Sequence, residues 1–199
     1  MKKINLYLIR HGKTEANEKK LYCGHTDLSL SSLGVEELKK LKGLYNKCDF
    51  YYTTGLKRTN ETLNILFDSD FYLIEDGFKE YNFGDFEMKG YDELKHKKEY
   101  IDWLEDTSGT YIIKNGESKN EYRERIKDTF KKFIRKLSKE NKKDVALICH
   151  GGTIGTILEQ FYDDEKDMFY WQPSCGRGYL LEIILEDDII NINSIQKIE

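Results

Sequence analysis

The chain has 199 residues, of which 39% are hydrophobic and 34% are charged, and its net charge is −4. That length and apolar content suit one domain with its own core, so we expect residues 1–199 to form a single domain. Acidic and basic residues are interleaved, which excludes the basic stripe that binds a nucleic-acid backbone. The first apolar run, residues 4–9, is too short for a signal peptide or a membrane span. We therefore expect a cytoplasmic protein with no nucleic-acid or membrane partner.

The first half of the chain alternates short apolar runs with amphipathic helical patterns, the rhythm of an α/β protein. In chain order the pattern predicts a strand at 4–9, a helix capped by Ser31 and extending toward Tyr45, a strand at 49–53, a helix at 56–67 and a strand at 71–74. A charged helical pattern follows at 91–103, and 111–116 has the composition of a loop. We expect residues 78–116 to be an excursion that forms a lid over the active site.

The second half of the chain begins with a long amphipathic pattern at 118–141. Its apolar face should lie in the core and its charged face in solvent. A buried strand at 145–149 and a further helix follow, and 179–185 with 189–195 form a terminal hairpin. The predicted fold class is a three-layer α/β/α sandwich with a mostly parallel central sheet, a helical lid and a C-terminal β-hairpin.

Two buried strands end in the same dipeptide, His-Gly, at His11 and at His150. Ligands bind at the carboxyl ends of parallel strands, so both imidazoles are expected in one crevice. Arg10 precedes the first of them, and a guanidinium can grip two phosphate oxygens while a histidine acts as nucleophile or base. Taken alone, Arg10-His11-Gly12 is better explained as an ordinary strand end, with Arg10 in solvent and His11 bound to a turn carbonyl. The second His-Gly favours a phosphate site.

Two further segments carry groups that suit phosphate chemistry. Arg58 lies at the start of a predicted helix, where it and backbone N–H groups can meet an anion. Glu80 and Glu87 lie among aromatic residues in the segment 78–87, and partial burial there would favour a protonated carboxyl able to act as a general acid. Glu80 is the preferred candidate, and Glu87 is the alternative.

The ordered set of these residues resembles the histidine phosphatase superfamily, also called the phosphoglycerate mutase-like proteins. The residues that carry the resemblance span nearly the whole chain: Arg10-His11-Gly12, Asn17, Gly24, Asp27, Arg58, Glu80 and His150-Gly151-Gly152. Segments 83–87, 91–94 and 116–118 resemble the α-ribazole phosphatase and broad-specificity phosphatase branch. The chain departs from the family pattern at Thr54, where Ser is common, at Gly55, where Pro or Asp is found, and at Met88, where Gly is usual.

The resemblance implies a role for each matching residue. His11 would attack phosphorus, and Glu80 would protonate the leaving oxygen and later activate water. The residues implied to bind the phosphoryl oxygens are Arg10, Arg58, His150 and Gly151, with Asn17 as a further phosphate ligand. For the attack, one nitrogen of His11 must be free, so the other should donate to a fixed acceptor, such as a backbone carbonyl. The implied substrate is a small phosphomonoester, with α-ribazole 5′-phosphate as one candidate, and the implied reaction uses no cofactor and no metal.

Two other functions remain open at this point. A phosphoglycerate mutase would use the same nucleophile, but the mutases of this superfamily have a longer insertion between the acid and the second histidine and a longer carboxyl tail. A catalytically inactive scaffold would be expected to lack a nucleophile, an acid or an arginine, and none of these is missing. We expect no role for His25 or His96, free thiols at all four cysteines, and lid packing for the aromatic residues of 81–103.

Overall fold

The computed structural model describes residues 2–199 and contains one six-stranded sheet with the order β3-β2-β4-β1-β5-β6. The strands are β1 (Lys2–Arg10), β2 (Phe50–Thr53), β3 (Leu73–Ile74), β4 (Asp144–Cys149), β5 (Gly178–Glu186) and β6 (Ile189–Ile198). The α-helices are α1 (Glu15–Glu18), α2 (Ser32–Lys40), α3 (Lys57–Phe67), α4 (Tyr91–Leu94), α5 (Lys98–Glu105), α6 (Lys119–Lys139) and α7 (Gly151–Phe161).

Four strands of the sheet are parallel to one another, and the two strands at one edge include antiparallel pairs. β1, β4, β2 and β3 are parallel, whereas β5 runs antiparallel to β1 and forms the predicted hairpin with β6. Arg10 pairs with Cys149 and Thr53 with Ile148, so β1, β4 and β2 end at the same edge of the sheet. The register therefore brings the residues that follow these strands together.

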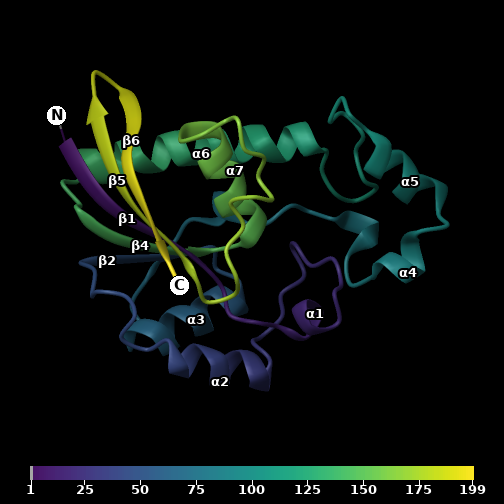
Figure 1. The fold of residues 1–199 in the computed structure, drawn as a ribbon, viewed down its shortest axis with the longest axis horizontal. Helices are drawn as coiled ribbons and strands as arrows, with labels where there is room; N and C mark the ends of the chain where they lie inside the picture. Colours follow the sequence, from purple (N-terminus) through teal and green to yellow (C-terminus); the bar gives the residue numbers. More distant parts are fainter. Residues whose placement is uncertain (1) are drawn as a thin grey trace.

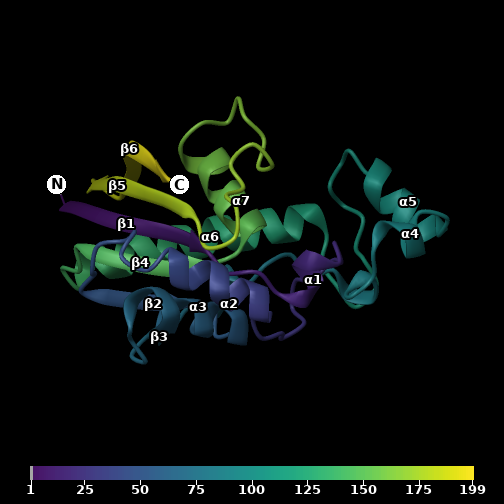
Figure 2. The ribbon, with the colours of Figure 1, turned by 60° about the horizontal axis from the view of Figure 1, so that its bottom comes forward.

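Helices cover both faces of the sheet, as the predicted three-layer fold requires. Helices α6 and α7 pack on one face and α2 and α3 on the other (Figures 1 and 2). The apolar face of α6 is buried as predicted. The buried residues of that face are Tyr122, Ile126, Phe130, Phe133, Ile134 and Leu137. Ser31 accepts a hydrogen bond from Gly34 N at 3.0 Å and caps α2, which ends before Tyr45. The side chain of Tyr45 is nevertheless buried against Tyr7.

Residues 78–116, which we call the lobe, extend beyond the carboxyl ends of β1 and β4 (Figures 1 and 2). The single helix predicted at 91–103 is wrong, because the chain turns at residues 95–97 and forms α4 and α5 instead. Leu94 and Tyr100 lie about 120° apart on a continuous helix, and the turn lets both side chains become buried. No helix within residues 2–199 combines the length and the apolar content needed to cross a bilayer.

Candidate active site

His11 follows the end of β1, and its ring is almost fully buried. Its Nδ1 lies 2.6 Å from the carbonyl oxygen of Gly12. A carbonyl can only accept, so Nδ1 carries the proton and Nε2 keeps its lone pair. Burial, together with the Arg58 and Arg10 cations, lowers the pKa of His11 well below its ordinary value of 6.5. The fixed backbone acceptor that a nucleophilic histidine needs is therefore present, and the ring is neutral at pH 7.

His150 follows the end of β4 and immediately precedes α7. Its ring centroid lies 5.2 Å from that of His11, so the structure brings the two His-Gly motifs together as predicted. Nε2 is 3.0 Å from the hydroxyl oxygen of Thr54, and Nδ1 is 3.4 Å from Nη2 of Arg58. An arginine can only donate, so the unprotonated nitrogen is Nδ1 and the Nε2–H group faces Thr54. Burial, Arg58, His11 and Arg10 lower the pKa of His150 well below 6.5.

Two guanidinium groups complete what we call the cup, defined as Arg10, His11, Arg58 and His150. Arg58 is fully buried in the first turn of α3, and it donates to the carbonyl oxygens of Gly24 at 2.6 Å and Thr26 at 2.8 Å. Arg10 donates to the Pro173 carbonyl at 2.9 Å. A Cβ atom placed on Gly151 would lie 3.1 Å from the Arg10 guanidinium carbon, so this glycine keeps the space against which Arg10 packs.

Both arginines keep an unused donor. Arg10 Nε and Arg58 Nε are buried and have no hydrogen-bond partner within residues 2–199. A buried donor without an acceptor is costly and uncommon, and such groups call for an explanation in function. Two of them, on two cations beside a neutral histidine, mark the cup as a place suited to an anion.

Glu80 is held over the first turn of α7 by hydrogen bonds to both of its carboxylate oxygens. Oε1 accepts from the Tyr122 hydroxyl at 2.7 Å and from its neighbour Tyr81 N at 2.9 Å. Oε2 accepts from Gly152 N at 2.8 Å. A Cβ atom on Gly152 would lie 2.4 Å from Oε1, so this position admits only glycine while Glu80 keeps its place. Glu80 thus lies beside the residue pair that follows His150.

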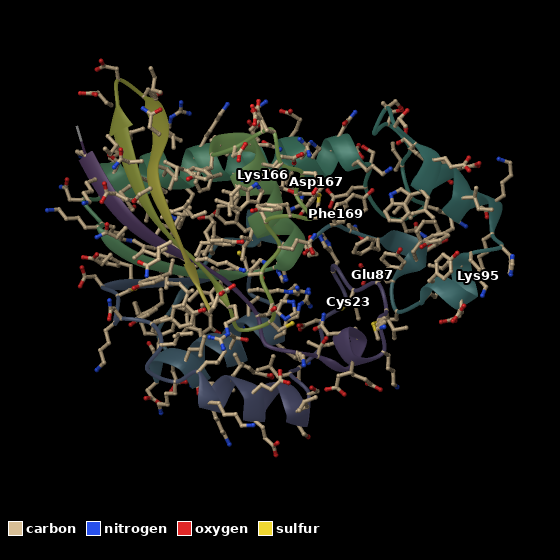
Figure 3. The ribbon with its side chains drawn as sticks, viewed as in Figure 1. Cys23, Glu87, Lys95, Lys166, Asp167 and Phe169 are labelled. Carbon is tan, nitrogen blue, oxygen red and sulfur yellow. The ribbon has the colours of Figure 1, made fainter. Side chains whose placement is uncertain are left out.

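Glu87, the alternative acid, has a different environment. Its two oxygens accept hydrogen bonds from the backbone N–H groups of residues 24, 25, 26 and 83 and from the Thr26 hydroxyl, at 2.6 to 3.2 Å. Glu87 therefore fixes the loop 24–26, whose carbonyl oxygens in turn hold Arg58. Figure 3 shows Glu87, which belongs to the lobe, close to Cys23, with Lys95 farther out in the lobe. A carboxylate saturated by five donors is suited to support rather than to proton transfer.

Arg125 of α6 was expected in solvent with the other charges of its helix, and that expectation is wrong. Its guanidinium pairs with Glu117 at 2.6 Å and donates to the carbonyl oxygens of Gly77, Lys79 and Glu80 at 2.9 to 3.2 Å. The physical reason is the sharp path of the chain through 77–80, which leaves three carbonyl groups without strand or helix partners. Arg125 satisfies them and fixes the backbone of Glu80.

The other residues singled out in the sequence lie outside the cup. Asp27 accepts from Lys57 N at 2.7 Å at the start of α3, and Asn17 Oδ1 accepts from Thr14 N at 2.9 Å in the turn that follows His11. His25 and His96 are exposed. All four cysteines are free thiols. Within residues 2–199 no group of three or more His, Cys, Asp or Glu side chains is arranged to hold a metal ion.

Sequence reasoning missed three groups of the site. Thr54 contacts His150, Tyr122 contacts Glu80, and Arg125 holds the Glu80 backbone. Tyr122 was assigned to the core because its spacing fits the apolar face of α6, and periodicity gives no sign of where a hydroxyl points. For Arg125 the sequence did contain a signal, the segment 116–118 that resembles the phosphatase branch. Within it Ser118 caps α6, and Glu117 forms the ion pair with Arg125.

A cup of two imidazoles and two guanidiniums at the ends of parallel strands defines a phosphate-handling α/β protein. The chain belongs to the histidine phosphatase superfamily (branch 1), whose family model matches residues 6–194. The predictions of this family and of a phosphatase are thereby confirmed.

Individual relatives agree with the family match. The adenosylcobalamin/alpha-ribazole phosphatase of Escherichia coli is 29% identical over 163 residues, which cover 78% of this chain and 77% of that protein. A 2,3-bisphosphoglycerate-dependent phosphoglycerate mutase of Parvibaculum lavamentivorans is 31% identical over 174 residues, 78% of each chain. The crystal structure of the alpha-ribazole phosphatase from Shigella flexneri has the same fold, with a TM-score of 0.78 at 23% identity over 96% of each chain.

Proposed function

We propose that the protein is a metal-independent phosphomonoesterase that works through a phosphohistidine on His11. The observation that carries this proposal is the state of His11, a buried neutral imidazole whose Nδ1–H is bound to Gly12 and whose Nε2 is free. Arg10 and Arg58 are close enough for their charges to lower the pKa of His11, each keeps an unused Nε donor, and together they would supply positive charge for the three equatorial oxygens of a phosphoryl group.

The reaction has two steps. His11 Nε2 attacks phosphorus, the bond between phosphorus and the ester oxygen breaks, and Glu80 in its protonated form gives its proton to the leaving oxygen. Water then attacks the phosphohistidine, the Glu80 carboxylate takes the proton of that water, and the N–P bond breaks to release phosphate. His11 returns to the neutral state with its Nδ1–H group still on Gly12, and Glu80 returns to the acid form.

The remaining site residues hold the phosphoryl group in line for attack. Arg10 and Arg58 supply guanidinium donors, and His150 becomes a donor through Nδ1 when it shares a proton with the bound dianion. Gly151 is the first residue of α7, so its N–H group lies at the helix N-terminus, where the helix dipole favours an anion. Asn17 lies in the turn after His11, and its amide nitrogen has no hydrogen-bond partner among the described residues, which leaves it available to a phosphate oxygen.

We infer that residues 1–199 act as one domain in which the lobe is the lid, and that the substrate is a small phosphorylated metabolite. The alpha-ribazole phosphatase relatives support α-ribazole 5′-phosphate as the first compound to try. The expectations of a cytoplasmic location and of no nucleic-acid partner stay predictions.

A second candidate is a phosphoglycerate mutase, because a mutase is 31% identical over 78% of this chain. A mutase passes the phosphoryl group from the histidine to a second hydroxyl group of the substrate instead of to water. Incubation with 3-phosphoglycerate and a trace of 2,3-bisphosphoglycerate separates the two activities. Release of inorganic phosphate without isomerisation supports the phosphatase.

The test of the proposed function is a turnover screen of the purified protein on a panel of phosphomonoesters, with p-nitrophenyl phosphate as the general substrate. We expect turnover that survives chelators and is inhibited by vanadate, which adopts the trigonal-bipyramidal shape of the transferring phosphoryl group. Activity that disappears on chelation and returns with zinc or magnesium contradicts the proposal.

A further inference from the structure

Tyr122 brings a fully buried hydroxyl to the candidate acid. Its side chain is 2% exposed near the start of α6, and its oxygen lies 2.7 Å from Glu80 Oε1 and 3.3 Å from Thr153 Oγ1. The Thr153 hydroxyl has an acceptor of its own, the Phe78 carbonyl oxygen at 3.2 Å. A tyrosine hydroxyl has one hydrogen, and the nearer and charged acceptor is Glu80, so the hydrogen is directed there.

The Tyr122 hydroxyl stays a donor throughout the working range of the enzyme. Burial and the neighbouring Glu80 carboxylate raise the pKa of Tyr122 well above its ordinary value of 10. The hydroxyl therefore does not ionise and does not compete with Glu80 for a proton.

The two oxygens of Glu80 differ in their surroundings. Oε1 has two donors, Tyr122 and Tyr81 N, whereas Oε2 has one, Gly152 N, in the turn that follows His150. A carboxyl oxygen that already accepts two hydrogen bonds is a poor place for a proton, because an O–H group there would face the donors. Oε2 keeps a lone pair free, and its donor belongs to the first turn of α7, directly after His150.

We propose that Tyr122 is a positioning residue that stabilises the Glu80 carboxylate and directs the transferable proton of Glu80 to Oε2. The position of the proton on Glu80 is inferred from the hydrogen-bond geometry alone. The use of that proton in catalysis rests on the proposed function. It explains why a hydroxyl is buried on the apolar face of α6, where phenylalanine would fill the same volume.

The proposal predicts how both chemical steps depend on pH. Formation of the phosphohistidine needs Glu80 protonated, and its hydrolysis needs the carboxylate. Loss of the Tyr122 hydroxyl favours protonation, so the alkaline limb of the first step and the acidic limb of the second should both move to higher pH. The free energy of one hydrogen bond to a charged group is equivalent to a shift of about one pH unit, so each limb should move by about that amount.

Other charged or titratable groups around Glu80 stay in place when Tyr122 is changed to phenylalanine. They are its chain neighbour Lys79, Arg58 of α3, Arg125 of α6 with its partner Glu117, Cys149 of β4, and Cys23 of the loop after α1. The comparison of Tyr122→Phe with the unchanged protein therefore isolates one hydroxyl. Tyr100→Phe is the matched control, because Tyr100 is also a buried tyrosine but lies in the lobe, where its hydroxyl contacts that of Tyr22 at 2.6 Å.

The experiment has two readouts. The first follows the Glu80 carboxyl of the resting enzyme by ¹³C-glutamate NMR as the pH changes, with Glu80→Gln to assign the signal. We expect the titration midpoint to rise by about one pH unit in Tyr122→Phe and to stay unchanged in Tyr100→Phe. An unchanged midpoint in a folded Tyr122→Phe protein, or an equal rise in Tyr100→Phe, overturns the proposal.

The second readout is the pH dependence of phosphohistidine formation and hydrolysis in single turnovers, where both limbs should move by the same amount as the midpoint. If the NMR midpoint moves but the pH profiles of the two steps do not, Tyr122 does not act on catalysis through Glu80, and that part of the proposal is overturned. A wild-type protein that forms no phosphohistidine contradicts the proposed function instead, and the NMR titration still decides the role of Tyr122 in placing the proton.

Discussion

The cup and the lobe are built from different kinds of interaction. Three cup residues lie at or directly after strand ends, and Arg58 lies in the first turn of α3. Each is held by a few polar contacts, such as His11 to Gly12 and His150 to Thr54. The lobe has no strand and only short helices, and it is held by aromatic packing around Trp103. The cup is thus specified by backbone geometry, and the lobe by side-chain volume.

Because of this difference, we expect substitutions in the cup and substitutions in the lobe to change different properties of the protein. A change in the cup should alter catalysis while the fold survives, whereas a change in the lobe core should reduce the free energy of unfolding. Two sets of contacts join the lobe to the cup. Glu87 fixes the loop 24–26, which holds Arg58, and Arg125 fixes the backbone of 77–80, which carries Glu80.

The largest effect that sharpens the comparison is expected for Glu80→Gln. An alkyl leaving group needs a proton far more than p-nitrophenolate does, so phosphohistidine formation from alkyl phosphates should slow by roughly 10²–10⁴-fold. With p-nitrophenyl phosphate the same single-turnover step should slow much less. Asp85→Asn is the control, because Asp85 is a carboxylate of the lobe that contacts Asn115. Its effect on the rate should be the same with both leaving groups. Equal slowing with both leaving groups means that Glu80 is not the donor, and Glu87 is then the residue to test.

Trp103→Ala tests whether the lobe is held by packing. The indole is 9% exposed and has the rings of Tyr22, Phe83 and Phe86 within 6.2 Å of it, centroid to centroid. Its removal should lower the free energy of unfolding by about 3–5 kcal/mol, measured by urea denaturation. Leu104→Ala on the exposed side of the same helix serves as the control. A loss below about 1 kcal/mol for Trp103→Ala would show that packing around this ring does not hold the lobe.

Acid should destabilise the protein through the cup. His11 and His150 stay neutral when folded, because their pKa values are lowered, but in the unfolded chain each takes up a proton as the pH falls below 6.5. The unfolded state then binds more protons, so the stability present above pH 6.5 is lost as the pH falls. Between pH 6.5 and 5.5 the loss should be about 1 kcal/mol per histidine.

Urea denaturation of the unchanged protein and of the double variant His11→Gln/His150→Gln measures this loss. The double variant should lose about 2 kcal/mol less over the same interval. Equal losses in the two proteins would mean that the cup histidines bind protons equally in the folded and unfolded states, which contradicts the lowered pKa values. The exposed His25 and His96 are present in both proteins and cancel in the comparison.

The smallest effect is expected at Met88, where the family pattern has glycine. Its φ is +59°, in the left-handed region that costs a residue with a Cβ atom about 1–2 kcal/mol. Met88→Gly should therefore raise the free energy of unfolding, by about 1 kcal/mol after the greater chain entropy of glycine is included. A lower stability for Met88→Gly in thermal or urea unfolding would show that the thioether side chain makes packing contacts worth more than this strain.

Much of the fold and the cup could be predicted from the sequence, because both depend on local patterns. Apolar runs mark β1 and β4, and the His-Gly pair after each marks the site. The lobe was harder to predict, because the split between α4 and α5 depends on which rings Leu94 and Tyr100 meet. Tyr122 and Arg125 were missed for a related reason, because both contact Glu80, which is distant in sequence, and periodicity reports only which face of a helix is buried.

The central claim is that His11 carries the phosphoryl group, and it can be tested directly. The protein is mixed with p-nitrophenyl phosphate, quenched in alkali within one turnover, and analysed by mass spectrometry of the intact chain and of its peptides. We predict one phosphoryl group per chain, on His11, and none on a His11→Ala protein that keeps its circular dichroism spectrum and loses turnover almost completely. A phosphoryl group on another residue, or near-normal turnover in His11→Ala, would contradict the account.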